Sequence, residues 1–282
     1  MASAFLRPIE DHDVAWLHSY EASTLAYFRP RFAASAPRFT ASEALFTRFS
    51  AAILDVIGQG RSLFRAVDEA HNELCVADCL LSDPSVKDST VLYEPTLPNT
   101  RKTIDFCLRD AEGLLTLIDV KTIKPQPLDR WDQYERAMRE GWLPKNIEFI
   151  VEQEGQGGEL WHTAFASRAR FLEYTLEFEQ KLASAAYGAV APRRILMFCG
   201  EGFYWHQDEL EDFVAYYRNG VHRGDDLFAL VESRHVLEKQ VDLQRSISSF
   251  GCLSRRHGDV QPRRFNWHVQ PGPEPFSRIA GA

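Results

Sequence analysis

The chain of 282 residues carries a formal net charge of −8, with 45% hydrophobic and 26% charged residues. These values are ordinary for a folded globular protein and exclude a low-complexity chain. The acidic balance argues against a protein that coats nucleic acid, because such binding relies on Lys and Arg. It does not exclude an enzyme that gathers carboxylates around a metal beside a local basic groove.

No apolar segment reaches the ~18–20 residues that a membrane-spanning helix needs, and the N-terminal residues are not those of a secretory signal. We therefore expect a cytoplasmic protein without a membrane partner. The five cysteines are scattered and odd in number, so reduced thiols are the default expectation. Cys75 and Cys79 share one face of an expected helix, where core packing is favoured over a zinc half-site that lacks two further ligands.

The N-terminal part of the chain reads as helical. Apolar residues recur at helical spacing from Ser42 to Ile57, and Gly58 and Gly60 end that helix. A further helix is expected from about Ser62 to Leu81, where Asp83-Pro84 stops it.

Strands follow these helices. Val91–Tyr93 is a short strand, and Thr103–Leu108 and Leu114–Ile123 are two longer ones separated by the turn Asp110–Gly113. The last two are close enough in sequence to form a hairpin. Downstream, the pattern alternates between helices and strands, namely helix Arg130–Glu140, strand Asn146–Glu152, helix Phe171–Tyr187, strand Arg194–Cys199 and helix Asp208–Asn219.

This order predicts an α/β fold in which helices flank a small mixed central sheet. We expect a helical N-terminal extension over 1–60, a core over 61–222, and a C-terminal helix with an irregular, weakly structured basic tail over 223–282, packed on the core. From Ser254 onward five arginines face two acidic residues. The tail is therefore either solvated or an arm that contacts phosphates.

Three charged residues interrupt the apolar strands of the expected hairpin. Asp105 lies among apolar neighbours, and Asp119 and Lys121 lie within the apolar run of the following strand. Burying such charges is costly unless they are paired or bound to metal. Side chains at i and i+2 of a strand share a face, so Asp119 and Lys121 project together, and a hairpin would bring Asp105 beside Asp119. The alternative is an exposed Asp119–Lys121 pair on an edge strand, with Asp105 in a turn.

This segment resembles the PD-(D/E)XK superfamily of restriction-endonuclease-like nucleases, whose core is a hairpin bearing an Asp followed by (Asp/Glu)-x-Lys. Asp105 matches the first Asp, and Asp119-Val120-Lys121 matches the second element. Ile104 stands where the pattern has Pro. The match covers the segment from Glu94 to Thr122 directly.

The resemblance implies a restriction-endonuclease-like core and a metal-dependent endonuclease that uses Mg²⁺, with Mn²⁺ as a substitute. Asp105 and Asp119 would hold the metal, and Lys121 would orient the attacking water. A Glu from the preceding helix would complete the site; Glu73 is preferred over Glu69. Gln133, in the helix after the lysine, would contact the site or the nucleic acid, although position 137 is Ala where some subfamilies have Tyr.

The expected partner is nucleic acid, with DNA favoured over RNA, and a homodimer would suit cleavage of both strands. Two alternatives stay open. One is a catalytically silent restriction-endonuclease-like module that acts in nucleic-acid binding or assembly. The other is an unrelated α/β protein with a chance match.

Overall fold

A computed structural model describes residues 9–60, 65–123, 146–152, 159–165, 167–187, 190–200, 207–219, 242–255 and 258–271. Within these residues the helices are α1 (Asp11–Ala34), α2 (Ser42–Gln59), α3 (Arg65–Ser82), α5 (Ser167–Ala183) and α6 (Gln207–Asn219). The strands are β1 (Thr90–Tyr93), β2 (Phe106–Arg109), β3 (Leu115–Ile123), β4 (Asn146–Glu152), β5 (Glu159–Phe165), β6 (Arg193–Gly200), β7 (Ser249–Ser254) and β8 (Arg264–Asn266).

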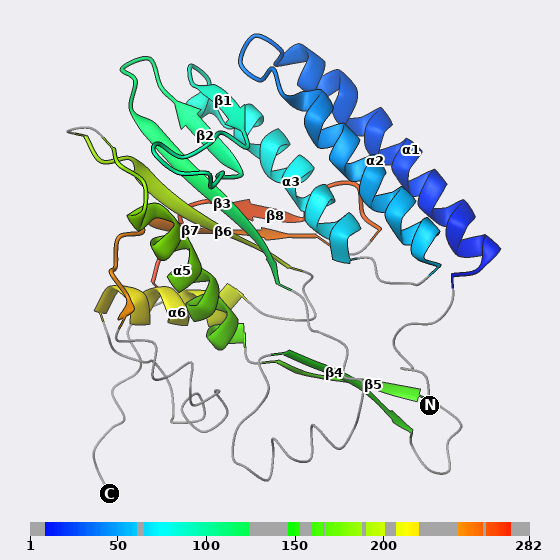
Figure 1. Cartoon of the computed structure of the whole chain (residues 1–282). Helices are drawn as coiled ribbons and strands as arrows, with labels where there is room; N and C mark the ends of the chain where they lie inside the picture. Colours follow the sequence, from blue (N-terminus) through cyan, green and yellow to red (C-terminus); the bar gives the residue numbers. More distant parts are fainter. Residues whose placement is uncertain are drawn as a thin grey trace, which may run out of the picture.

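Six of the strands form one mixed sheet in the order β1-β2-β3-β6-β7-β8 (Figure 1). The inner strands β3, β6 and β7 run parallel, and the outer pairs are antiparallel. The expected hairpin is present, because β2 and β3 pair across the turn, where Gly113 adopts a φ of +84°. The α/β class with a mixed central sheet flanked by helices is therefore confirmed.

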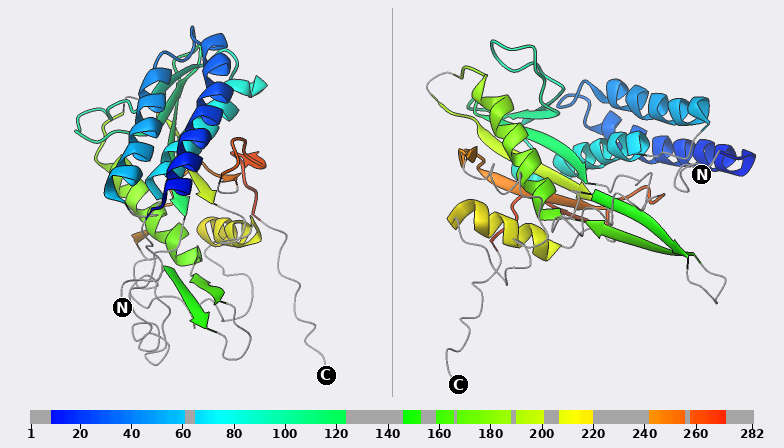
Figure 2. Two further views of the ribbon diagram at one scale, coloured as in Figure 1. Left: turned by 90° about the vertical axis from the view of Figure 1, so that its right-hand side faces the viewer. Right: turned by 60° about the horizontal axis from the view of Figure 1, so that its bottom comes forward.

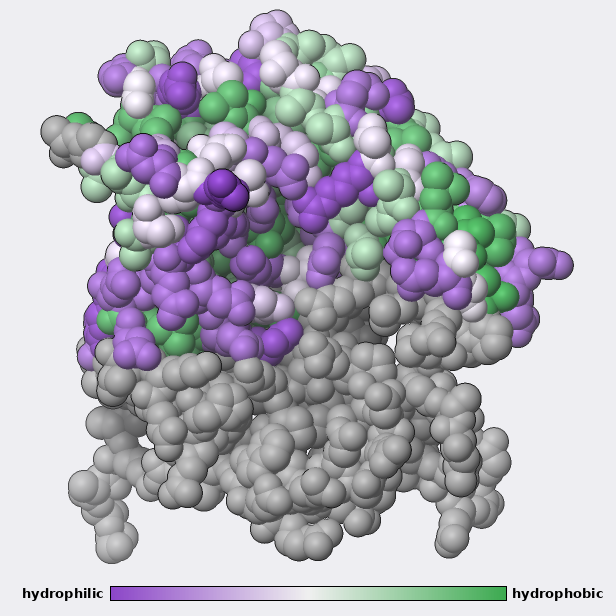
Figure 3. All heavy atoms as spheres, viewed as in Figure 1, coloured by the Kyte–Doolittle hydropathy of each residue, from purple (hydrophilic) through white to green (hydrophobic). Residues whose placement is uncertain are grey.

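Helices cover both faces of this sheet (Figures 1 and 2). The alternation of β6 shows the two layers: Ile195 and Met197 join the core cluster that contains α1, α2 and α3, whereas Leu196 and Phe198 join the cluster that contains α5 and α6. This is the period of two that a strand buried on both faces requires. The described surface over α5 is mostly hydrophilic in the space-filling view (Figure 3).

The N-terminal helices share the core of the sheet. α2 ends as expected at Gly60, which adopts the left-handed conformation with a φ of 62°. Leu17 of α1 and Phe49 of α2 belong to the same buried cluster as Ile118 and Ile195 of the sheet. The expected N-terminal extension and the sheet are thus parts of one packed body. None of the helices in the described ranges is long and apolar enough to cross a membrane.

The prediction of a weakly structured C-terminal tail is wrong for two segments. β7 and β8 complete the sheet, and Phe250 and Leu253 of β7 are fully buried. Gly251 interrupts the apolar run of β7, which hides the strand from a periodicity argument. The glycine allows close packing there, because a Cβ atom would overlap the end of the Met197 side chain, which would have to shift. A C-terminal helix is expected within 223–282, and residues 223–241 of that range lie outside the described residues.

The middle of the chain departs from expectation in a second way. Asn146–Glu152 is a strand, as predicted, but it pairs with β5 in a separate two-stranded sheet (Figure 2). β5 itself was not expected. The predicted helix over Arg130–Glu140, with Gln133, lies outside the described residues.

Arg255 is buried and does not belong to an exposed basic tail. Its side chain is only 4% exposed and donates to Asp68 Oδ1 at 2.6 Å, to the Tyr20 hydroxyl at 2.8 Å and to Asn72 Oδ1 at 3.2 Å. These partners lie on α1 and α3, so the residue after β7 is tied to the helices on the other side of the core. Arg255 is therefore a buried structural residue and is excluded from any phosphate-contacting arm.

Replacing Arg255 with Ala is expected to lower the free energy of unfolding by about 3–5 kcal/mol, because the 1% exposed carboxylate of Asp68 loses this cation. The matched control is Arg263→Ala, which removes the ion pair between Arg263 and Asp259. These side chains are 49% and 39% exposed, so the loss should lower the free energy of unfolding by about 1 kcal/mol or less. Urea denaturation of both variants measures the difference. Equal losses in the two variants would contradict the assignment.

Candidate functional site

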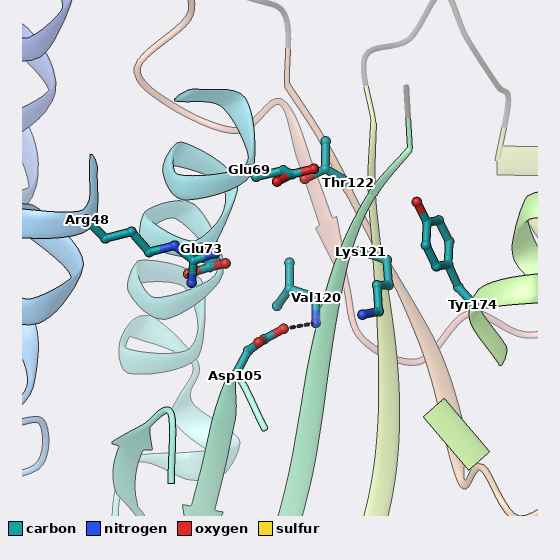
Figure 4. A pocket seen from close by; sticks show the side chains of 8 residues that line it. All are labelled: Arg48, Glu69, Glu73, Asp105, Val120, Lys121, Thr122 and Tyr174. Carbon is teal, nitrogen blue, oxygen red and sulfur yellow. Dashed lines mark hydrogen bonds and ion pairs between the residues drawn. The ribbon is translucent and has the colours of Figure 1, made fainter. Parts of the chain in front are cut away.

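The β2–β3 hairpin opens at one end. The pairing of the two strands ends at Phe106 and Ile118, so the following residues of β3 have no β2 partner. Asp105 fills the gap: its Oδ2 accepts the backbone N–H of Val120 at 2.6 Å (Figure 4). The sequence prediction that Asp105 lies next to Asp119 is therefore confirmed as geometry.

A pocket of about 220 Å³ lies at this opening. α2 contributes Arg48 and α5 contributes Tyr174, so helices from both faces of the sheet reach it (Figure 4). The remaining lining residues come from α3, from the residue before β2 and from β3, namely Glu69, Glu73, Asp105, Val120, Lys121 and Thr122. Ionic side chains of both signs thus face one cavity.

Asp119 carries two ion pairs. Its side chain is 1% exposed, and the Nζ of Lys181 in α5 donates to Oδ1 at 2.6 Å. The Nζ of Lys121 lies 3.0 Å from Oδ2. Asp119 and Lys121 therefore share a face of β3, as predicted. The alternative of an exposed edge-strand pair is wrong, because β3 lies between β2 and β6 and Asp119 is buried.

Burial and neighbouring charges shift the pKa values of Asp105 and Lys121. Burial and the neighbouring Asp119 carboxylate raise the pKa of Asp105 to about 6, even though the Val120 N–H favours the anion. Burial alone would lower the pKa of Lys121, but the ion pair with Asp119 outweighs it and the pKa is raised. The lysine is therefore held in its charged form beside two carboxyl groups.

Glu73 adds a third carboxyl group. It is 4% exposed, and burial together with repulsion from Asp105 raises its pKa to about 8. Its Oε2 accepts hydrogen bonds from Arg48 and from the Tyr93 hydroxyl, both at 2.8 Å. Glu69 also lines the pocket, but Glu73 is the glutamate whose pKa is raised by the charge of Asp105.

Sequence reasoning missed four residues of the site. Arg48 lies on α2, and Tyr174 and Lys181 lie on α5, so all three are outside the hairpin motif, at positions typical of solvated or core residues. Tyr93 was seen only as a strand residue. The Lys121 Nζ lies 5.7 Å from the centre of the Tyr174 ring, within the range of a cation–π contact. Gln133 belongs to the residues that the structure does not describe.

Only two of the three carboxylates expected to hold a cation are suited to it. Within the described residues no group of three or more His, Cys, Asp or Glu is arranged to hold a metal ion, so the expected set of Asp105, Asp119 and Glu73 is not assembled. The physical reason is that Arg48 and Tyr93 engage Glu73. Oδ2 of Asp119, however, is buried, and the partner that the structure gives it is the Nζ of Lys121 at 3.0 Å. A carboxylate oxygen of this kind lies beside Asp105, whose pKa is raised by burial and by the charge of Asp119. Two such aspartates suit a hard divalent cation.

The cysteines offer no second site of this kind. Cys75 is buried and Cys79 is half-buried, and both are free thiols on α3. Burial raises the pKa of both thiols, that of Cys79 to about 12, so they stay protonated at neutral pH. The favoured expectation of packing over zinc binding agrees with this burial.

No protein-family model, no curated protein and no solved structure matches this chain. The interpretation of the pocket therefore rests on its geometry and charges.

Glu73 should make the stability of the fold depend on pH. Its pKa is about 8 in the folded chain and 4.5 without the fold, so between these values the folded protein keeps a proton that the unfolded chain releases. The free energy of unfolding should therefore fall as the pH rises, by up to about 1.4 kcal/mol for each unit. Glu73→Gln should flatten this decline most clearly between pH 7 and pH 8, above the pKa of about 6 of Asp105.

Urea denaturation at pH 6, 7 and 8 measures this slope. Glu112→Gln is the matched control, because Glu112 is an exposed residue of the β2–β3 turn. If the slope of the Glu73→Gln variant equals that of the unaltered protein, Glu73 does not carry the proton.

Proposed function

We propose that this chain is a divalent-cation-dependent nuclease that hydrolyses phosphodiester bonds in nucleic acid, with DNA as the favoured substrate. One observation carries the proposal. At the open end of a β-hairpin, buried Asp119 shares a strand face with Lys121, and Asp105 lies beside them at a pocket. Carboxylate oxygens next to a lysine are the groups that phosphodiester hydrolysis with a hard cation requires.

The order of the elements supports the same assignment. α3 precedes the hairpin and contributes two glutamates to the pocket, and α5 follows Lys121 and contributes Tyr174. The resemblance to the PD-(D/E)XK nucleases implies a helix before the hairpin, which is the position of α3; the helix that it implies after the lysine is expected over Arg130–Glu140, outside the described residues. We extend the proposal to a restriction-endonuclease-like core comprising α3, β1, β2, β3, α5 and β6.

Asp105 and Asp119 would hold Mg²⁺, or Mn²⁺ in its place. When bound, such a cation polarises the scissile phosphate and lowers the pKa of a coordinated water. Lys121 lines the pocket with its ammonium group, which can orient the attacking water and stabilise negative charge that develops on the phosphate.

Glu73 suits proton transfer better than cation binding. Its Oε2 already accepts two hydrogen bonds, and a pKa of about 8 leaves a proton on the carboxyl group at neutral pH. A carboxyl group that titrates near the working pH can donate a proton to a departing oxygen. Arg48 and Tyr93 would fix its orientation.

Asp119→Asn and Lys121→Ala are each expected to lower Mg²⁺-dependent cleavage by about 10²–10³-fold or more, because each removes a charged group from the reacting centre. Cleavage is measured on supercoiled plasmid, linear duplex, single-stranded DNA and RNA, with Mg²⁺ or Mn²⁺. Lys87→Ala, which alters an exposed lysine away from the pocket, is the control and should cleave normally.

Circular dichroism and thermal melting must show that the variants fold. Absence of any cation-dependent cleavage by the unaltered chain would reject the nuclease. Tight binding of the same substrates without cleavage would instead favour the catalytically silent module.

A further inference from the structure

The two lysines on Asp119 are not equivalent. Lys181 donates a hydrogen bond of 2.6 Å to Oδ1. The Nζ of Lys121 lies 3.0 Å from Oδ2, a longer contact than that of Lys181. Oδ1 is therefore the more firmly held oxygen, and Oδ2 is the one whose partner is more easily replaced by another ligand.

Lys121 and Lys181 also differ in their positions relative to the pocket. Lys121 lines the pocket, faces the ring of Tyr174 and is influenced by the charge of Asp105. Lys181 comes from α5 and is absent from the pocket lining. Lys121 can thus move from Asp119 toward a bound phosphate without leaving the cavity, whereas Lys181 has no such path through the pocket.

The charges explain why a second lysine is needed. Asp105 and Asp119 are balanced by Lys121 and Lys181. Without Lys181, Lys121 would be the sole ammonium group of the described residues on a carboxylate that is 1% exposed, and moving it would leave a buried charge without compensation. With Lys181 in place, one lysine can leave.

We propose that Lys181 is a positioning residue that keeps Oδ1 of Asp119 occupied, so that a divalent cation arriving at Oδ2 displaces Lys121 alone and frees it for the phosphate. This inference rests on the proposed function, since it assigns the order in which the same site exchanges its cations. Lys181 acts through Asp119 and does not touch the substrate.

The first test uses the unaltered protein. Reductive methylation labels lysine amines, and mass spectrometry reads each lysine with and without Mg²⁺. Both side chains are partly exposed, 25% for Lys121 and 21% for Lys181, so the reagent can reach each of them, and each lysine is compared with itself. We expect Mg²⁺ to raise labelling of Lys121 about threefold or more, because a broken ion pair frees its amine, and to leave Lys181 unchanged.

A second test uses variants and the affinity for Mn²⁺, measured by calorimetry. Lys121→Met removes the displaced competitor and should tighten Mn²⁺ binding about tenfold. Lys181→Met should not tighten it, because Lys121 then becomes the one counter-ion of Asp119 within the described part of the chain and is harder to displace. Lys181→Arg keeps a cation at this position, so its cleavage rate should be closer to that of the unaltered chain than the rate of Lys181→Met. Lys87→Met, at an exposed site, is the control.

The outcomes separate the two proposals. If Mn²⁺ binds but both lysines respond alike, or Lys181 responds alone, or neither does, the positioning role of Lys181 is overturned while the nuclease stands. If no Mn²⁺ binds, or if Asp119→Asn does not weaken its binding, the proposed cation site fails and this inference fails with it.

Discussion

Asp119 is a carboxylate in the interior of the sheet, and the surrounding elements are arranged around its charge. An ion taken out of water costs several kcal/mol unless its charge is compensated nearby. β3 itself provides Lys121 two residues further on, where strand geometry returns a side chain to the same face. The second ammonium group, that of Lys181, must come from another element, so α5 packs across β3 with this lysine aimed at the strand. The position of α5 and the charge compensation of Asp119 therefore depend on each other.

The open end of the hairpin has a comparable double role. Where β2 leaves β3, a backbone N–H inside the protein loses its sheet partner and needs another acceptor. The carboxylate of Asp105 meets that need at Val120, and in doing so it is held beside Asp119. A separation of strands that leaves a backbone donor unpaired thus creates the cavity and also places a second carboxyl group in it.

Local patterns predicted the parts of the fold that depend on near neighbours. The helical spacing in α2 and α3 and the apolar run of β3 were sufficient for their bounds, and the short turn set the hairpin register that joins Asp105 to Asp119. Residues that act through distant contacts gave no signal. Lys181 lies 62 residues from Asp119, and Arg255 lies 187 residues from Asp68. In the sequence, Lys181 resembles a solvated helix residue and Arg255 part of a basic tail. β7 was missed because the glycine that permits its close packing also interrupts its apolar pattern.

α3 connects the structural core to the pocket through two pairs of residues, each spaced by four. Asp68 and Asn72 hold Arg255, and Asn72 also donates to the Thr122 hydroxyl of β3 at 2.9 Å. Glu69 and Glu73 directly follow Asp68 and Asn72 on the same helix, and both line the pocket. Positions four apart stack on one face of a helix, so the first pair fixes the rotation of α3 against β3 and the second pair is thereby directed into the cavity. The buried arginine beyond β7 consequently orients the glutamates without touching them, and the strand that the sequence concealed is part of what positions the candidate site.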